Sequence, residues 1–171
     1  MQQLIVPVAD ILGHPGVVRE VRLQAVLPGI SNALVELEAS PIDAALRAES
    51  VVEGILVSGR VRGRAAVRCA RCLADLSKPI ELDVCELFIT EDRRLPEEEA
   101  YRLSGADMNL EPMLRDAVAL ALPLNPLCRE DCLGLCATCG RDLNQGPCLC
   151  RDDTPDPRWA ALAGLRERLE G

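Results

Sequence analysis

Aromatic side chains are nearly absent from this chain of 171 residues, which has one Trp, one Tyr and one Phe. Proteins that stack on unpaired bases use several aromatic rings, so this composition argues against recognition of nucleic acid by base stacking. Histidine is equally scarce, because His14 is the only one and lies in a Gly-His-Pro-Gly turn. No P-loop, GxGxxG, GxSxG or HExxH motif occurs. The sequence therefore predicts a protein that is not an enzyme and has no small-molecule substrate.

Long apolar runs are also missing. No segment approaches the roughly 18 consecutive apolar residues that span a bilayer, so no membrane role is expected. The first ten residues lack a basic segment followed by an apolar stretch, which indicates that they are not a secretory signal and predicts a reducing, cytoplasmic location. Hydrophobic residues nevertheless make up 49% of the chain, and that fraction is enough to bury a core.

Lysine is the third scarcity, because Lys78 stands alone beside eighteen arginines. The formal net charge is −8, so nucleic acid would repel the chain on average and any contact with RNA would need a local basic patch. The stretch from Gly54 to Ala74 has no acidic residue. Its five arginines are Arg60, Arg62, Arg64, Arg68 and Arg71. Guanidinium groups bind phosphate oxygens bidentately, so these five are the predicted nucleic-acid-binding residues.

Period-two alternation predicts a β-hairpin in the middle of the chain. From Val51 to Cys69 most odd positions are apolar, whereas four arginines occupy even positions. Residues 79–84 alternate in the same way, with Glu81 and Asp83 facing outward. These two acids could lie opposite the arginines and neutralise them, which is an ordinary arrangement on a solvated strand. A turn with a CxxC cysteine pair would form the tip of the hairpin.

Cysteine is abundant. Six of the nine fall within twenty-three residues, at 128, 132, 136, 139, 148 and 150, and a CxxC pair lies upstream at 69 and 72. The segment 136–140 reads CATCG, a zinc-knuckle pattern whose glycine can adopt positive φ so that backbone N–H groups point at the sulfurs. Two cysteines separated by one residue on an extended segment place both thiols on one face. We therefore predict a tetrahedral zinc site formed by Cys136, Cys139, Cys148 and Cys150.

The other cysteines leave alternatives open. In one scheme Cys69, Cys72, Cys128 and Cys132 form a second four-thiolate site. In another, Cys128 and Cys132 join the knuckle and leave Cys148 and Cys150 to meet the CxxC pair, because spacing does not fix the partition. Disulfides are disfavoured in a reducing compartment, and the ferredoxin spacings typical of iron–sulfur centres are absent. Cys85 fits neither scheme and is expected to be a small buried apolar residue.

These patterns predict an α+β fold. Short strands are expected at residues 4–8, 17–26 and 33–38, a helical turn at 43–49, and a helix at 110–122 that begins after Asn109 and ends at Pro123. We predict an antiparallel β-rich domain, a sheet or partly open barrel with one packed helix, over residues 1–125. A zinc-knuckle module follows over 126–151 and a C-terminal helix over 152–171. Four thiolates leave zinc no open position for substrate, so the predicted metal role is structural.

Four stretches carry a family resemblance: CARCL at 69–73, ALALPL at 119–124, LCREDCLGLCATCGRDLNQGPCLC at 127–150 and DPRWAAL at 156–162. In them the chain resembles the bacterial YceD family, the large ribosomal RNA subunit accumulation proteins. The resemblance implies a cytoplasmic role in synthesis, processing or stability of large-subunit ribosomal RNA, without established enzymatic activity. The implied partner is that RNA or a pre-large-subunit particle. The predicted binding is to ribosomal RNA, to a ribosomal protein, or to both.

Two other functions stay open at this point. One is a zinc-stabilised protein–protein adaptor outside ribosome assembly, whose acidic surface and terminal helix contact a basic partner. The other is a thiol redox protein built on Cys69 and Cys72. This CxxC pair precedes a predicted strand, whereas low-pKa thiols of thioredoxin-like sites lie at a helix N-terminus, which disfavours the redox function.

Overall fold

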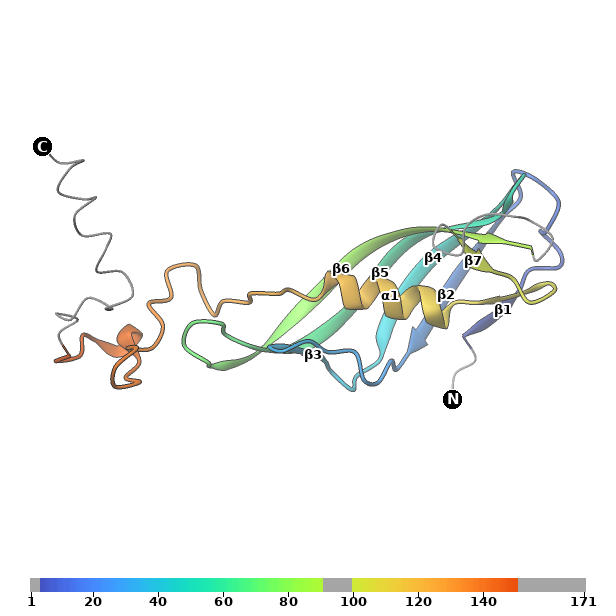
Figure 1. Ribbon diagram of the computed structural model, residues 1–171. Helices are drawn as coiled ribbons and strands as arrows, with labels where there is room; N and C mark the ends of the chain where they lie inside the picture. The colour runs from blue at the N-terminus through green and yellow to red at the C-terminus, as the bar shows by residue number, and fades with distance from the viewer. Residues whose placement is uncertain (1–3, 91–99, 151–171) are drawn as a thin grey trace, which may run out of the picture.

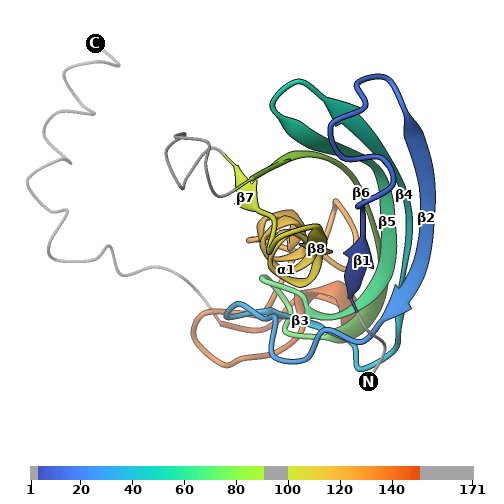
Figure 2. The same ribbon diagram turned by 90° about the vertical axis from the view of Figure 1, so that its right-hand side faces the viewer.

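The computed structural model describes residues 4–90 and 100–150. The strands are β1 (Ile5–Pro7), β2 (Val18–Ala25), β3 (Val35–Leu37), β4 (Ile42–Val51), β5 (Gly54–Arg68), β6 (Asp75–Ile89), β7 (Tyr101–Arg102) and β8 (Asp107–Asn109). Helix α1 (Glu111–Ala121) and the 3-10 turn η1 (Leu143–Gln145) follow them. A six-stranded, mostly antiparallel sheet has the order β2-β4-β5-β6-β7, with β3 paired to the far end of β5. The larger sheet is seen in Figure 1, and strands β1 and β8, which form a separate two-stranded sheet, are both labelled in Figure 2.

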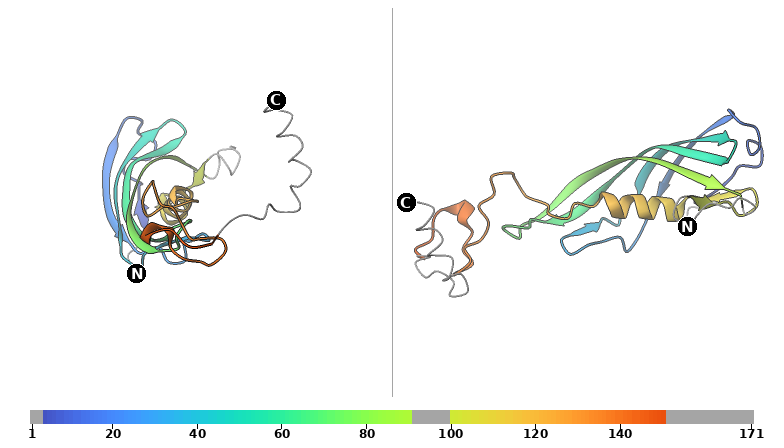
Figure 3. Two further views of the ribbon diagram at one scale, coloured as in Figure 1. Left: turned by 90° about the vertical axis from the view of Figure 1, so that its left-hand side faces the viewer. Right: turned by 45° about the horizontal axis from the view of Figure 1, so that its top comes forward.

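The hairpin of β5 and β6 is the longest element of the sheet. Its strands pair over their whole length, from Gly54 opposite Ile89 to Arg68 opposite Asp75. The predicted alternation is present, because the apolar odd positions of β5 from Ile55 to Val67 are buried and its arginines are exposed. The turn between the strands lies at one end of the molecule, and the cysteine-rich segment extends beyond it (Figures 1 and 3). The hairpin therefore carries its CxxC loop away from the core.

Helix α1 fills the concave side of the curved sheet (Figure 2). The N-cap of α1 is Leu110, which makes no side-chain cap bond, so the expected cap at Asn109 is one residue too early, although Asn109 Oδ1 accepts from Glu111 N at 3.1 Å. Met113, Leu114 and Val118 are buried against the sheet, whereas Leu120 is 88% exposed. The helix expected at 110–122 is thus present over Glu111–Ala121. None of the helices in residues 4–90 and 100–150 is long and apolar enough to cross a membrane.

The prediction of a helical turn at 43–49 is wrong, because these residues belong to strand β4. Alternate residues from Ile42 to Ala48 are buried, which is the period of a strand. Alanine and arginine favour helices in isolation, but pairing with β2 on one side and β5 on the other decides the conformation. The expected strands nearer the N-terminus are present as the shorter β1, β2 and β3. The helix predicted at 152–171 lies outside the described residues.

Candidate metal centre

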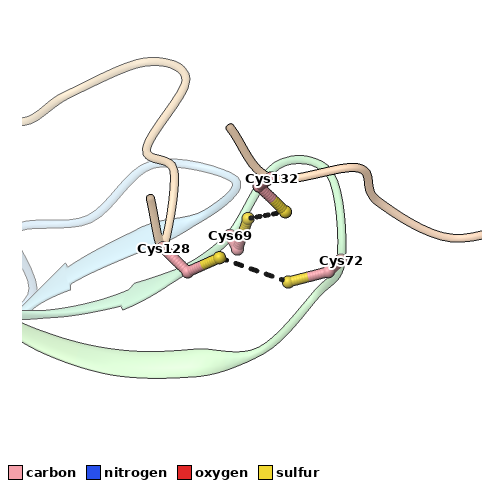
Figure 4. A group of neighbouring side chains, drawn as sticks. All are labelled: Cys69, Cys72, Cys128 and Cys132. Carbon is pink, nitrogen blue, oxygen red and sulfur yellow. Dashed lines mark hydrogen bonds between the residues drawn. The ribbon is translucent and has the colours of Figure 1, made fainter. Parts of the chain in front are cut away.

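Two groups of four cysteines lie in and beyond the hairpin tip, and within each group the sulfur atoms are all within 4.8 Å of one another. The first group, called group I here, consists of Cys69, Cys72, Cys128 and Cys132 (Figure 4). Its Cys69 and Cys132 sulfurs are 3.8 Å apart, and its Cys72 and Cys128 sulfurs are 3.7 Å apart. All four thiols are free. A tetrahedral ion with bonds of about 2.3 Å separates its sulfur ligands by about 3.8 Å, so group I has the spacing of a metal site.

Group I joins two parts of the chain that are distant in sequence. Cys69 directly follows β5 and is fully buried, whereas Cys128 comes from the segment after α1. Ala70 N donates to Pro126 O at 2.8 Å and Lys78 Nζ donates to Leu127 O at 2.6 Å, which fixes that segment beside the hairpin. The hairpin tip and the start of the cysteine module are therefore held together before any metal is considered.

Backbone N–H groups converge on the Cys69 sulfur. Those of Cys72, Cys128 and Arg71 act against the effect of burial, and the pKa of the Cys69 thiol is lowered to about 6. Leu73, just after the CxxC pair, has φ of 60°, which lets the chain turn back into β6. This loop thus has the form of a knuckle, with a leucine at the position where Gly140 follows the other CxxC pair.

The second group, called group II, consists of Cys136, Cys139, Cys148 and Cys150. Gly140 has φ of 71°, which confirms the positive φ expected after the CATC sequence, and its N–H donates to Cys136 O at 2.9 Å. The N–H groups of Cys139 and Thr138 lower the pKa of the Cys136 thiol to about 6. Cys136 is 9% exposed and Cys139 lies at the surface, so group II is more open than group I.

Some thiols in these groups have a raised pKa and so resist ionisation. The neighbouring Cys132 thiol raises the pKa of Cys128 to about 12, and the Cys139 thiol does the same to Cys150. Each further thiolate is repelled by those already present, and a divalent cation removes this penalty. A donor set of four sulfurs at tetrahedral spacing fits such a cation, so each group could hold a metal ion.

Of the two partitions considered from the sequence, the structure brings together the one in which Cys128 and Cys132 lie with Cys69 and Cys72. The expectation that Cys85 is buried is wrong, since its side chain is exposed. Inward positions on this part of β6 are even-numbered, as buried Ile80 and Val84 show, and position 85 falls on the outer face.

The predicted nucleic-acid-binding arginines of β5 lie on the outer face of the sheet, each near a polar or acidic partner. Arg60 contacts Asp83 at 3.0 Å and Glu81 at 3.2 Å, and Glu81 also contacts Arg62 at 3.2 Å. Arg64 donates to Ser77 Oγ at 2.8 Å and lies 3.8 Å from Glu38, and Arg68 lies 2.9 Å from Asp75. Their side chains remain 51–61% exposed. The face is thus a row of ion pairs with accessible guanidinium groups.

Arg71, the fifth predicted arginine, has another position. Its Nη1 donates to Cys132 O at 2.8 Å and to Glu130 O at 3.4 Å, so it contacts the backbone of group I and not the row on β5.

Asn144 is a residue that sequence reasoning missed altogether. Its side chain lies 3.5 Å from the Cys132 sulfur, and the only sequence signal was its place in the linker between the halves of group II.

Residues 57–166 match the model of a family described as Large ribosomal RNA subunit accumulation protein YceD. Similar curated proteins include uncharacterized proteins of Mycobacterium bovis and Mycobacterium tuberculosis, each 40% identical over 128 residues, which cover 72% of this chain and 61% of the relative. An uncharacterized protein of Mycobacterium leprae is 35% identical over 160 residues, covering 89% of this chain and 72% of the relative. The chain therefore spans less than two thirds of the first two relatives. No solved structure matches it.

Proposed function

Because this chain belongs to the YceD family, we propose that it is a non-enzymatic factor in large ribosomal subunit biogenesis. Its role is to support the synthesis, processing or stability of large-subunit ribosomal RNA. The family match carries this proposal, and the matched residues 57–166 include most of the β5–β6 hairpin and both cysteine groups. The site of action is the cytoplasm, where the large subunit is assembled.

The non-enzymatic part of this proposal is supported by the kind of site that the cysteines could form. We propose that the metal is zinc in both groups, because zinc prefers four thiolates in tetrahedral geometry. Such an ion has no free coordination position for water or substrate, so its chemistry is to hold ligands together. In group I it would tie the hairpin tip to the segment after α1, and in group II it would close the knuckle.

Contact with RNA would use phosphate groups and the exposed guanidinium groups of β5. Arg60, Arg62 and Arg64 lie on one face of one strand, and arginine can exchange a carboxylate partner for a phosphate because both accept bidentate hydrogen bonds. The acidic partners reduce the local positive charge, so binding would be weak without a second contact. That second contact would be a ribosomal protein.

A protein contact is favoured by the surface of the cysteine module. Leu133 and Leu149 belong to the segments that form groups I and II and are 66% and 99% exposed. Apolar side chains on a module braced by metal ions offer a rigid contact area, which limits the entropy lost on binding. A zinc-stabilised adaptor that binds a basic protein outside ribosome assembly is therefore the second candidate function.

Depletion of the protein in its own host tests the proposed function. The measurements are the ratio of large- to small-subunit ribosomal RNA and the position of the tagged protein in a sucrose gradient. We expect a selective loss of large-subunit RNA and protein in pre-large-subunit fractions. An unchanged ratio with protein only at the top of the gradient would contradict the assembly role and favour the adaptor.

A further inference from the structure

The side chain of Asn144 connects the two cysteine groups. This residue lies between Cys139 and Cys148, inside the loop of group II, yet its Nδ2 donates to the sulfur of Cys132 in group I at 3.5 Å. Its Oδ1 accepts from Leu133 N at 2.9 Å and from Arg129 Nη2 at 2.8 Å, and both donors come from the chain around Cys132. A residue of one group thus completes the surroundings of the other.

The loop that carries Asn144 makes several hydrogen bonds that orient its side chain. Asp142 Oδ1 accepts from Asn144 N at 2.9 Å and from Asn144 Nδ2 at 2.6 Å, which orients the amide. Leu143 N donates to Gly134 O at 2.9 Å, and Cys136 N donates to Arg141 O at 2.8 Å. Residues 141–144 are therefore hydrogen-bonded to residues 134–136. The latter belong to the short segment that joins Cys132, the last ligand of group I, to Cys136, the first ligand of group II.

The same segment touches the hairpin tip. Leu135 N donates to Arg71 O at 3.2 Å, and Gly134 has φ of 76°. A Cβ at position 134 would lie 3.0 Å from Arg71 O. The joining segment is therefore in direct contact with the hairpin tip of group I as well as with the loop of group II.

We propose that the two metal ions bind cooperatively, with Asn144 as the residue that couples them. Metal in group II would close the loop between Cys139 and Cys148 and so hold the Asn144 amide against the Cys132 sulfur. An N–H donor at a thiolate offsets part of the charge of a four-thiolate site, and such partners beside a ligand typically change metal affinity by 10–100-fold. Because coupling of binding free energies is reciprocal, metal in group I strengthens group II by the same factor.

The two groups draw on different parts of the chain, because the ligands of group II span residues 136–150 and those of group I span 69–132. This inference needs metal in both groups but does not depend on the proposed ribosomal role.

A thermodynamic cycle on the full chain tests the proposal, with Co²⁺ as the probe because its thiolate complexes absorb visible light. The affinity of group I is measured by chelator competition in four proteins: the unchanged chain, Asn144→Ala, a chain with group II disabled by Cys148→Ser and Cys150→Ser, and the combination. We expect either change alone to weaken Co²⁺ binding in group I by about 10–100-fold. Their combination should cost no more than the larger single effect, because both act through one contact.

Two controls separate coupling from general damage. Gln145→Ala removes the neighbouring amide, whose side chain bonds to Asp142 Oδ2 at 3.3 Å, and it should leave group I affinity unchanged. In a chain with group I disabled by Cys69→Ser and Cys72→Ser, Asn144→Ala should leave group II affinity unchanged if the loop is intact. The proposal would be overturned if Asn144→Ala bound Co²⁺ in group I as tightly as the unchanged chain. It would also be overturned if the losses of group I affinity from Asn144→Ala and from disabling group II were additive in the combined variant.

Discussion

Arg71 donates to the carbonyl oxygen of Cys132 at 2.8 Å, although the two residues are 61 positions apart in the chain. Arg71 lies between the two cysteines of the hairpin tip, and its own carbonyl oxygen accepts from Leu135 N at 3.2 Å. One residue thus bonds to the backbone on both sides of Gly134. Its sequence position suggested a role in binding phosphate, whereas its contacts are those of a brace for group I.

Removing this brace should weaken metal binding. We expect Arg71→Ala to lower the free energy of unfolding of the metal-loaded protein by about 1.5–3 kcal/mol, the usual cost of a lost hydrogen bond to a charged group. Arg62→Ala is the matched control, because its ion pair with Glu81 is 61% and 50% exposed and should contribute less than about 1 kcal/mol. Thermal unfolding together with chelator competition provides the measurement. If the two variants lost equal amounts of unfolding free energy, the Arg71 contacts would stabilise the protein no more than an exposed ion pair does.

Charge changes on the outer face of the hairpin should alter RNA binding in opposite directions. If Arg60, Arg62 and Arg64 contact phosphates, their replacement by glutamate abolishes association with ribosomal RNA. Neutralising the paired acids with Glu81→Gln and Asp83→Asn should increase the affinity and steepen its dependence on salt, because more guanidinium charge becomes available.

Filter binding over a range of salt concentrations measures both effects, and circular dichroism checks the fold. Exposed ion pairs of this kind typically contribute about 0–1 kcal/mol each, so all variants should remain folded. RNA affinity that changes with neither set of substitutions would exclude the arginine face as the RNA contact. Contact through a ribosomal protein would then be the remaining form of the proposed function.

The sequence predicted an element well where the local pattern of apolar and polar residues matches the burial of those residues in the folded protein. Alternation on β5 identified its buried and exposed faces, and Pro123 marked the end of α1 directly after its C-cap Leu122. Strand β4 was missed because its alanines and Arg47 have no strong preference for strands, and its conformation depends on pairing with strands on both sides.

The cysteine groups likewise have some features that the local sequence predicts and others that depend on the folding of distant segments. The CATCG spacing and the positive φ of Gly140 follow from local backbone chemistry, so they could be read from the residues. The meeting of Cys69 and Cys72 with Cys128 and Cys132 depends on how α1 directs the chain back to the hairpin tip, which spacing does not encode. The roles of Arg71 and Asn144 depend on the same long-range approach.

Gly59 should be intolerant of any side chain. It lies inside β5 with φ of 151°, and a Cβ there would be 2.3 Å from the carbonyl oxygen of Ala45 on β4. We expect Gly59→Ala to cost about 1–3 kcal/mol of unfolding free energy, because the backbone must leave a conformation that is nearly exclusive to glycine. Ser58→Ala, at the next position, should change it by less than about 0.5 kcal/mol. Urea unfolding of both variants compares them, and equal midpoints would contradict the prediction.

Metal binding to group I should release protons and weaken as the pH falls. Every ligand must be a thiolate in the metal complex, but the pKa of Cys128 is raised to about 12 by the Cys132 thiol, so Cys128 carries a proton at neutral pH. Metal must displace this proton, and affinity therefore rises with pH. Below about 6 the Cys69 thiol also becomes protonated, and the pH dependence should become steeper there.

Calorimetric titration with Zn²⁺ in buffers of different ionisation enthalpy counts the protons released. The chain in which Cys148→Ser and Cys150→Ser disable group II isolates group I. Adding Cys85→Ser to that chain should leave the number of released protons unchanged, because Cys85 lies outside both groups. Cys128→Ser, which removes the thiol with the raised pKa, should lower both the count and the affinity. An affinity that does not vary with pH would mean that the four thiols are already ionised before metal arrives, and that the N–H groups around Cys69 supply more stabilisation than their contacts indicate.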